Sequence, residues 1–157
     1  MKIQTKVKKA SVIKARIGIE SGGKAHKFFT KTCYRYMSKF VPGGEKNDLN
    51  QNVEIVTDCI TYKSPYAHYQ YIGKLYIDPK YKVGAFPIRA GKISFNPADG
   101  EIEGFVSRKG IPKISTNKDL SYKSHPGTGS YWDKKMWTSK KKDVIEEVQK
   151  YIDRGCM

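Results

Sequence analysis

Helical periodicity between Ser21 and Phe40 constrains the fold of this chain more than any other feature of its sequence. Apolar and small residues recur there at steps of three and four, at Ala25, Phe28, Phe29, Thr32, Cys33, Tyr36, Met37 and Phe40. Basic residues keep the same steps on the opposite side, at Lys24, Lys27, Lys31, Arg35 and Lys39. This spacing predicts an amphipathic helix with one basic face. Pro42 and the glycines after it predict its end.

A second helical pattern runs from Ser130 to about Ile152. Its apolar positions are Trp132, Met136, Trp137, Val144, Val148, Tyr151 and Ile152. Ser130, with Asp133 three residues later, predicts a capping box at the start, and Gly155 lies beyond the predicted end. The lysines between 134 and 142 fall mainly off the apolar positions. The pattern predicts a second amphipathic helix over 130–152.

Alternating residues between 2 and 19 predict one or two half-buried strands. A helix over 13–19 stays an alternative, because Gly18 is the only helix breaker in that stretch. Residues 43–52 are polar and predict a loop, and the β-branched residues of 53–62 predict a single strand. A short helix is predicted over 65–72, with Ser64 as its N-cap, Pro65 in its first position and Gly73 at its end. A short strand over 75–77 follows.

Glycine and proline punctuate the region from Pro79 to Gly110, which predicts an inserted loop or hairpin. The simplest arrangement is a hairpin that turns at Ala98-Asp99-Gly100. Taken together, the patterns predict an α+β fold in one domain over residues 1–157. Its antiparallel sheet is packed by the two long helices, at about 21–40 and 130–152.

The chain is strongly basic. Its 157 residues include 30 Lys and Arg against 15 Asp and Glu, a net charge of +15, and Glu20 is the only acid before Glu45. Such a charge predicts attraction to polyanions and says nothing about fold. No apolar run approaches the roughly 20 residues of a membrane-spanning helix, and the basic N-terminus lacks the apolar core of a signal peptide.

No local motif predicts catalysis, a cofactor or a metal site. The three histidines, His26, His68 and His125, lie on different elements and lack the spacing of metal ligands. Cys33 and Cys59 fall on predicted apolar faces and are expected to be small buried hydrophobes, whereas Cys156 lies on the C-terminal tail. Glu101 and Glu103 share a strand face, which is more typical of a solvated surface than of an acid and base pair.

Five tyrosines, at positions 62, 66, 69, 71 and 76, crowd around the predicted short helix. Interleaved with Lys63, His68 and Lys74, they suit a platform for stacking single-stranded nucleic acid. They equally suit packing and subunit contact, because tyrosine combines a large apolar area with a polar tip. Packing and subunit contact are the favoured interpretation.

Three blocks of the sequence resemble one protein family. The run Tyr66-Ala67-x-Tyr69-Gln70-Tyr71-x-Gly73 closely resembles the pattern in the minor capsid proteins of tailed bacteriophages, which are small head-tail connector or neck components. The Ser21–Lys24 entry to a helix that ends at Phe40-Val41-Pro42 is similar to the family's first helix, and residues 125–132 are similar to its Pro/Gly-rich entry to the last helix. The blocks cover roughly half of the chain. Residues 43–49 depart from the family's turn, and 79–110 has no counterpart.

The resemblance implies a structural virion protein without catalytic activity or cofactor, assembled in the cytoplasm of the bacterial host. Copies would form a closed ring in the neck around the DNA channel, next to a head-closure or adaptor protein and a tail terminator or tail tube protein. Packaged double-stranded DNA is a further expected partner, through non-specific phosphate contacts. The alternative is a stand-alone basic nucleic-acid-binding protein. A third class, a small enzyme such as a nuclease, requires a carboxylate cluster that the sequence does not display.

Two sets of residues are the candidates for these contacts. The expected subunit-interface residues are Tyr66, His68, Tyr69, Tyr71, Tyr131 and Trp132. The residues expected to face the DNA channel or an acidic partner are Lys24, Lys27, Lys31, Arg35, Lys80, Lys82, Arg89 and Lys92.

Overall fold

The computed structural model describes residues 10–43, 49–122 and 126–155. It divides into two compact units, one from residues 1–67 and 122–157 and the other from residues 68–121. Helices and antiparallel strands occur in the described residues, which confirms the predicted α+β class. The prediction of one domain stays a prediction, and each unit is described by itself.

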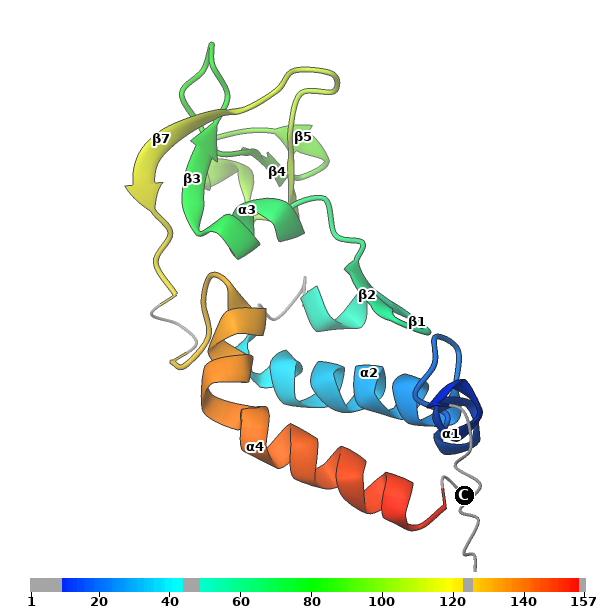
Figure 1. The fold of residues 1–157 in the computed structure, drawn as a ribbon. Coiled ribbons are helices and arrows are strands. Elements are labelled where there is room, and N and C mark those ends of the chain that lie inside the picture. The colour runs from blue at the N-terminus through cyan, green and yellow to red at the C-terminus, as the bar shows by residue number, and fades with distance from the viewer. Residues whose placement is uncertain (1–9, 44–48, 123–125, 156–157) are drawn as a thin grey trace, which may run out of the picture. The chain divides into compact units, whose positions relative to one another are not determined.

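Two long helices build the first unit, and both were predicted. They are α2 (Lys24–Met37), which the 3₁₀ turn η1 (Ser38–Phe40) extends, and α4 (Trp132–Asp153). The helices lie side by side along their length (Figure 1). Their buried apolar residues are Ala25, Met37, Trp132, Met136 and Val144. At the far end of α4 the Phe28 and Tyr151 rings stack, with centroids 4.1 Å apart.

The predicted capping box at the start of α4 is wrong. Tyr131 takes the N-cap position with a left-handed backbone (φ 49°, ψ 46°), and no side chain caps the helix. The entry loop is fixed by a tertiary contact, because the Gly129 amide donates to the Phe40 carbonyl at 3.1 Å. With the loop held in this way, the chain enters the helix only after Ser130. The predicted end of α4 is confirmed, since Gly155 (φ 81°) donates its amide to the Ile152 carbonyl at 2.9 Å.

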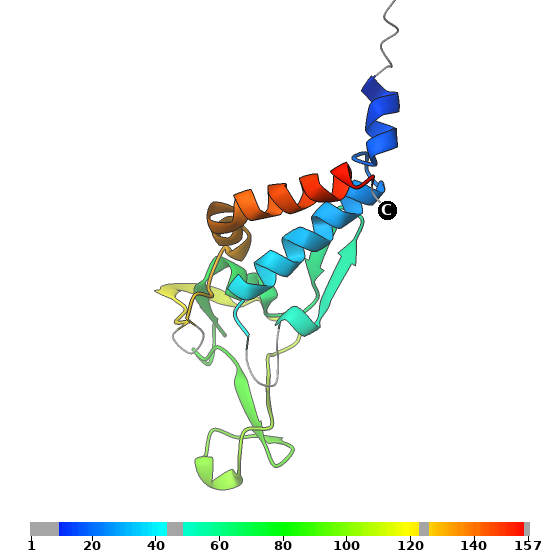
Figure 2. The ribbon, with the colours of Figure 1, turned by 90° about the horizontal axis from the view of Figure 1, so that it is seen from below.

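The N-terminal segment is helical where strands were predicted. Helix α1 (Ala10–Ile17) leads into the start of α2 (Figure 2), and residues 2–9 of the predicted strands lie outside the described residues. Gly18 ends α1 with a φ of 73° and donates its amide to the Lys14 carbonyl at 2.9 Å. None of the described strands covers these apolar positions, and Val12 and Ile19 remain exposed. The alternative of a helix over 13–19 is therefore closer to the structure than the predicted strands.

Gly23 is required where the chain passes from α1 to α2. A Cβ atom at this position would overlap the Gly18 carbonyl oxygen and approach the Glu20 carbonyl oxygen to 2.9 Å. We therefore expect Gly23→Ala to destabilise the first unit by about 1–3 kcal/mol, because the neighbouring backbone must move. Gly104→Ala is the matched control, since a methyl group at that position would have no neighbouring atom within 4 Å. Equal thermal unfolding temperatures for the two variants would contradict this account.

A β-hairpin replaces the single strand predicted over 53–62. Strands β1 (Val53–Val56) and β2 (Cys59–Tyr62) pair antiparallel, and Thr57 and Asp58 form the turn between them. The Thr30 hydroxyl on α2 donates to the Thr57 carbonyl at 2.9 Å, and this bond ties the turn to the helix. The ring of Tyr62 meets Trp132 edge-on at 5.3 Å, so the start of α4 also packs on the hairpin. The 3₁₀ turn η2 (Leu49–Gln51) precedes β1, within the predicted loop.

The short helix α3 (Ala67–Ile72) confirms a short helix in the stretch predicted over 65–72, and the division between the two units falls inside it. It begins two residues later than predicted, so Pro65 is not in its first position and Ser64 is not its N-cap. Its turn begins where the Ser64 carbonyl accepts the Ala67 amide at 3.0 Å. Gly73 (φ 76°) closes it, as predicted, with its amide bonded to the Tyr69 carbonyl at 2.9 Å. Strand β3 (Lys74–Ile77) then pairs with β7 (Ile114–Asp119), which confirms the strand predicted over 75–77.

The inserted region forms a three-stranded sheet instead of a hairpin at 98–100. Strand β4 (Phe86–Arg89) is central, between β5 (Lys92–Ile93) and β6 (Gly104–Val106). The tight turn falls at Ala90 and Gly91, whose φ values of 44° and 71° suit a two-residue hairpin loop. Residues 97–99 instead form the 3₁₀ turn η3 (Pro97–Asp99), because the Asn96 side chain accepts the Ala98 amide. Asp99-Gly100 therefore lies at the end of a 3₁₀ turn and not in the predicted hairpin turn.

An ion pair between a half-buried arginine and a buried carboxylate closes the loop after β3 in the second unit. The Arg108 guanidinium donates to both oxygens of Asp78, at 2.6 and 2.7 Å. The amides of Lys80 and Tyr81 donate to the same carboxylate at 2.9 and 3.0 Å. Arg108 first, and these amides with it, hold the pKa of the Asp78 carboxyl well below its usual range.

This ion pair makes the stability of the second unit depend on pH. A depressed carboxyl pKa contributes stability that is fully present above the unfolded pKa of about 4 and is lost as pH falls toward the folded pKa. We expect Asp78→Asn to unfold at a lower temperature than the wild type at pH 7, and the difference to shrink progressively below about pH 4. Thermal unfolding across pH, followed by circular dichroism, measures this. Asp58→Asn, at an exposed turn, is the control, and a pH-independent gap for Asp78→Asn would contradict the prediction.

Candidate functional site

An exposed row of lysines follows the outer side of α2. Lys24, Lys27 and Lys31 lie outside the buried core, and none forms an ion pair with another described residue. We call these three residues the basic row. The predicted basic face of this helix is therefore confirmed at these positions. Their charges are uncompensated within the described part of the chain and available to an anionic partner.

Arg35, the fourth predicted cation of this helix, has a structural partner. Its guanidinium donates to both carboxylate oxygens of Glu147 on α4, and the Tyr36 hydroxyl donates to the same carboxylate at 3.3 Å. The pair joins α2 to α4, so Arg35 holds the two helices together instead of extending the basic row. Sequence patterns did not reveal this pairing, because the partners are 112 positions apart.

Of the four predicted cations in the inserted region, three are exposed and one has a structural partner within its unit. Lys80, Lys82 and Lys92 lie at the surface, and the ammonium of Lys80 lies 5.3 Å from the Tyr81 ring centroid. Arg89 is half-buried and donates to the Gly100 carbonyl. Arg89 therefore anchors the loop between β5 and β6, and the three lysines remain available for contact.

The tyrosine block is divided between the two units. Tyr66 is half-buried in the first unit, and His68 is exposed in the second, where Tyr69 and Tyr71 are half-buried. The Tyr69 ring lies 4.8 Å from the Tyr76 ring and 5.5 Å from the Lys113 ammonium. These contacts engage Tyr69 in packing within its unit, which favours packing over base stacking at this residue. A role of the block at a subunit interface stays a prediction.

The two aromatic residues at the start of α4 have opposite environments. Tyr131 is exposed, with the Lys134 ammonium 4.7 Å from its ring centroid. Trp132 is only 3% exposed and belongs to the core of the first unit. Its burial removes Trp132 from the candidate interface residues, whereas Tyr131 keeps an accessible ring.

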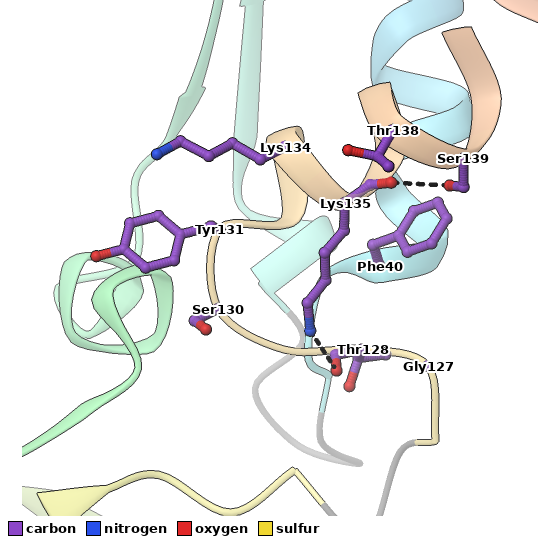
Figure 3. Close-up of a pocket in the computed structure, with 9 residues that line it drawn as sticks. All are labelled: Phe40, Gly127, Thr128, Ser130, Tyr131, Lys134, Lys135, Thr138 and Ser139. Atoms are coloured by element: carbon purple, nitrogen blue, oxygen red, sulfur yellow. Dashed lines mark hydrogen bonds between the residues drawn. The ribbon is translucent and has the colours of Figure 1, made fainter. Parts of the chain in front are cut away.

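A pocket of about 710 Å³ lies beside the first turns of α4 (Figure 3). It is lined by Phe40, Gly127, Thr128, Ser130, Tyr131, Lys134, Lys135, Thr138 and Ser139. The Lys135 ammonium reaches back to the Thr128 carbonyl at 3.3 Å, while Tyr131 and Lys134 point to the other side of the turn (Figure 3). Both charged side chains of the lining are cationic, so the pocket suits an anionic group.

Sequence reasoning missed this pocket. The helical pattern showed only that the lysines of 134–142 fall mainly off the apolar positions. The glycines at 127 and 129, just before a helix that begins with lysines, were the available signal. That signal is weak, because the pocket also needs Phe40, which comes from the end of η1.

The cysteines differ from one another in environment. Burial raises the pKa of the half-buried Cys33 thiol to about 11, which keeps it neutral and unreactive near pH 7. Cys59 is exposed on β2, so the prediction that it is buried is wrong. The hairpin turn that the sequence did not predict places it on the open side of its strand. Cys156 and His125 lie outside the described residues.

The described residues contain neither a metal-binding cluster nor a membrane-spanning helix. No group of three or more His, Cys, Asp or Glu side chains in residues 10–43, 49–122 and 126–155 is arranged to hold a metal ion. Among the helices of that part of the chain, none combines the length and apolar content needed to cross a lipid bilayer.

Comparison with known proteins gave no relative: no family model, no curated protein and no solved structure matches the chain.

Proposed function

We propose that this chain is a structural subunit of the neck of a tailed bacteriophage, where identical copies close into a ring around the DNA channel. The basic row on α2 carries the proposal, because three neighbouring lysines that pair with no acid among the described residues suit a surface that faces a polyanion. The resemblance of the three sequence blocks supports the proposed family. The order of a long helix, a short helix closed by Gly73 and a long last helix agrees with that resemblance.

The proposed mechanism is geometric. Each copy presents two different surfaces that fit one another, and the head-to-tail contact closes by rotation into a ring. The ring joins a head-closure or adaptor protein to a tail terminator or tail tube protein. Within it the basic row faces either packaged DNA, through sequence-independent phosphate contacts, or an acidic neighbouring ring.

Reversal of the basic row tests the proposal in the assembled particle. In phage carrying Lys24→Glu, Lys27→Glu and Lys31→Glu, we expect fewer completed particles and loss of packaged DNA, because the reversed charges repel phosphate or an acidic neighbour. Electron microscopy of particles and the nuclease-protected DNA fraction measure the two effects. Lys109→Glu with Lys118→Glu is the control, since both lysines are exposed in the second unit. Normal completion and normal retention in the triple variant would contradict both forms of the mechanism.

The second candidate is a stand-alone nucleic-acid-binding protein, which the same basic row favours. It predicts a monomer or dimer with tight, salt-dependent affinity for DNA and no chain in purified virions. The ring proposal predicts the chain in virions in a fixed ratio to the other neck proteins. Mass spectrometry of purified particles separates the two candidates.

A further inference from the structure

The loop between β5 and β6 exposes apolar and acidic side chains together. We call residues 95–103 the acidic loop, and every one of them is exposed. Phe95 and Ile102 are 58% and 38% exposed. Asp99, Glu101 and Glu103 carry the charge, the segment has no basic residue, and none of these acids forms an ion pair within the described residues. An ordered surface of this kind suits a basic partner with apolar area.

Hydrogen bonds hold the acidic loop in one conformation. They join Asn96 to Ala98, Ser94 to Asp99, Arg89 to Gly100 and Gly91 to Glu103. A loop that is already ordered loses little conformational entropy when it binds. The bonds therefore favour binding, and Phe95 and Ile102 are exposed in this conformation.

One exposed side of α4 has the opposite charge and a similar apolar content. Lys134, Trp137, Lys141 and Ile145 recur there at steps of three and four, and we call them the α4 stripe. Trp137 and Ile145 are 38% and 49% exposed. Neither lysine of the stripe pairs with an acid among the described residues, and the Lys141 ammonium lies 5.8 Å from the Trp137 ring centroid. Lys134 is also among the residues that line the pocket, although its side chain points to the other side of the turn (Figure 3).

We propose that the acidic loop of one copy docks on the α4 stripe of a second copy of this chain. The inference rests on the proposed function, since a ring of identical subunits needs two different surfaces that fit one another. Phe95 and Ile102 supply apolar area to cover Trp137 and Ile145. The acids of the loop offset the lysines of the stripe, and this charge complementarity identifies the occupant.

Reciprocal charge reversal tests the contact. The loop variant carries Glu101→Lys and Glu103→Lys, and the stripe variant carries Lys134→Glu and Lys141→Glu. Each variant opposes like charges, so we expect self-association of the full chain to weaken at least about tenfold in sedimentation velocity at low salt. An equal mixture of the two variants restores association, because each reversed surface then meets its complement. Lys109→Glu with Lys118→Glu changes the net charge as the stripe variant does and should leave association unchanged.

Three results would overturn the inference. The first is a wild-type chain that stays monomeric up to its highest soluble concentration. The second is self-association of both reversed variants as strong as that of the wild type. The third is an equal mixture of the two variants that does not regain self-association. Failure of the mixture would also indicate that the loop and the stripe meet within one chain, because mixing two variants cannot restore an intramolecular contact. The proposed function is judged separately by the presence of the chain in virions. A chain that is found in virions but associates independently of these charges refutes only this contact.

Discussion

Trp132→Ala should destabilise the first unit by about 3–5 kcal/mol, the largest stability loss that we expect from one substitution. The indole is 3% exposed, lies between the start of α4 and the hairpin, and meets the Tyr62 ring at 5.3 Å. Its removal leaves a cavity at the point where α4 joins the core. Because small domains are stable by only about 5–15 kcal/mol, a substantial fraction of the variant should be unfolded at physiological temperature. Urea denaturation followed by circular dichroism measures the change.

The second tryptophan provides the matched control. Trp137 is 38% exposed and contacts the Phe29 ring edge-on at 6.5 Å. Trp137→Ala should therefore cost only about 1 kcal/mol. It should also weaken self-association, because Trp137 belongs to the α4 stripe. Equal stability losses in the two variants would show that Trp132 is not the core residue described above.

Neutralisation of the basic row should have the largest effect on binding. For Lys24→Gln, Lys27→Gln and Lys31→Gln together, we expect affinity for double-stranded DNA to fall roughly 10²-fold near 0.1 M salt. The slope of log affinity against log salt should lose about 0.9 for each lysine, because fewer counterions are released. Fluorescence anisotropy with a labelled duplex at several salt concentrations measures both quantities. The loss should be the same for unrelated DNA sequences, since phosphate contacts carry no sequence information.

Lysines elsewhere provide the control for the effect of total charge. The variant Lys109→Gln, Lys118→Gln and Lys142→Gln removes three charges from exposed positions outside the basic row. It should change affinity and slope much less than the first variant. Equal losses would mean that the chain binds DNA through its overall charge and that α2 has no special role. An unchanged affinity in the basic-row variant would favour an acidic protein partner.

Local patterns predicted α2, α3 and α4 well. Residues of α2 and α4 repeat at helical steps over many turns, and Gly73 and Gly155 mark helix ends because glycine adopts positive φ without strain. The buried and exposed sides of α2 follow from the same steps. The accessible lysines of the basic row were therefore predictable from sequence alone.

Contacts between distant residues account for most of the differences. The hydrogen bond from the Gly129 amide to the Phe40 carbonyl fixes the entry loop, and α4 begins after Ser130, later than predicted. The hydrogen bond from the Thr30 hydroxyl to the Thr57 carbonyl holds the hairpin turn that was not predicted. The partnership of Arg35 with Glu147 likewise joins two elements that no local pattern relates. The apolar residues of a short segment such as α1 fit both the helical and the strand repeat. No strand among the described residues lies beside α1 to pair with it, which favours the helix.

The copy number of the chain in purified virions tests the central claim most directly. Quantitative mass spectrometry, calibrated against the major capsid protein, should find the chain in tailed particles at a constant small number of copies per particle, as a closed ring requires. Washing with high salt should leave that number unchanged, because completed ring contacts bury apolar surface. Absence of the chain from particles, or a number that varies with salt and DNA content, would contradict the neck proposal and favour a stand-alone nucleic-acid-binding protein.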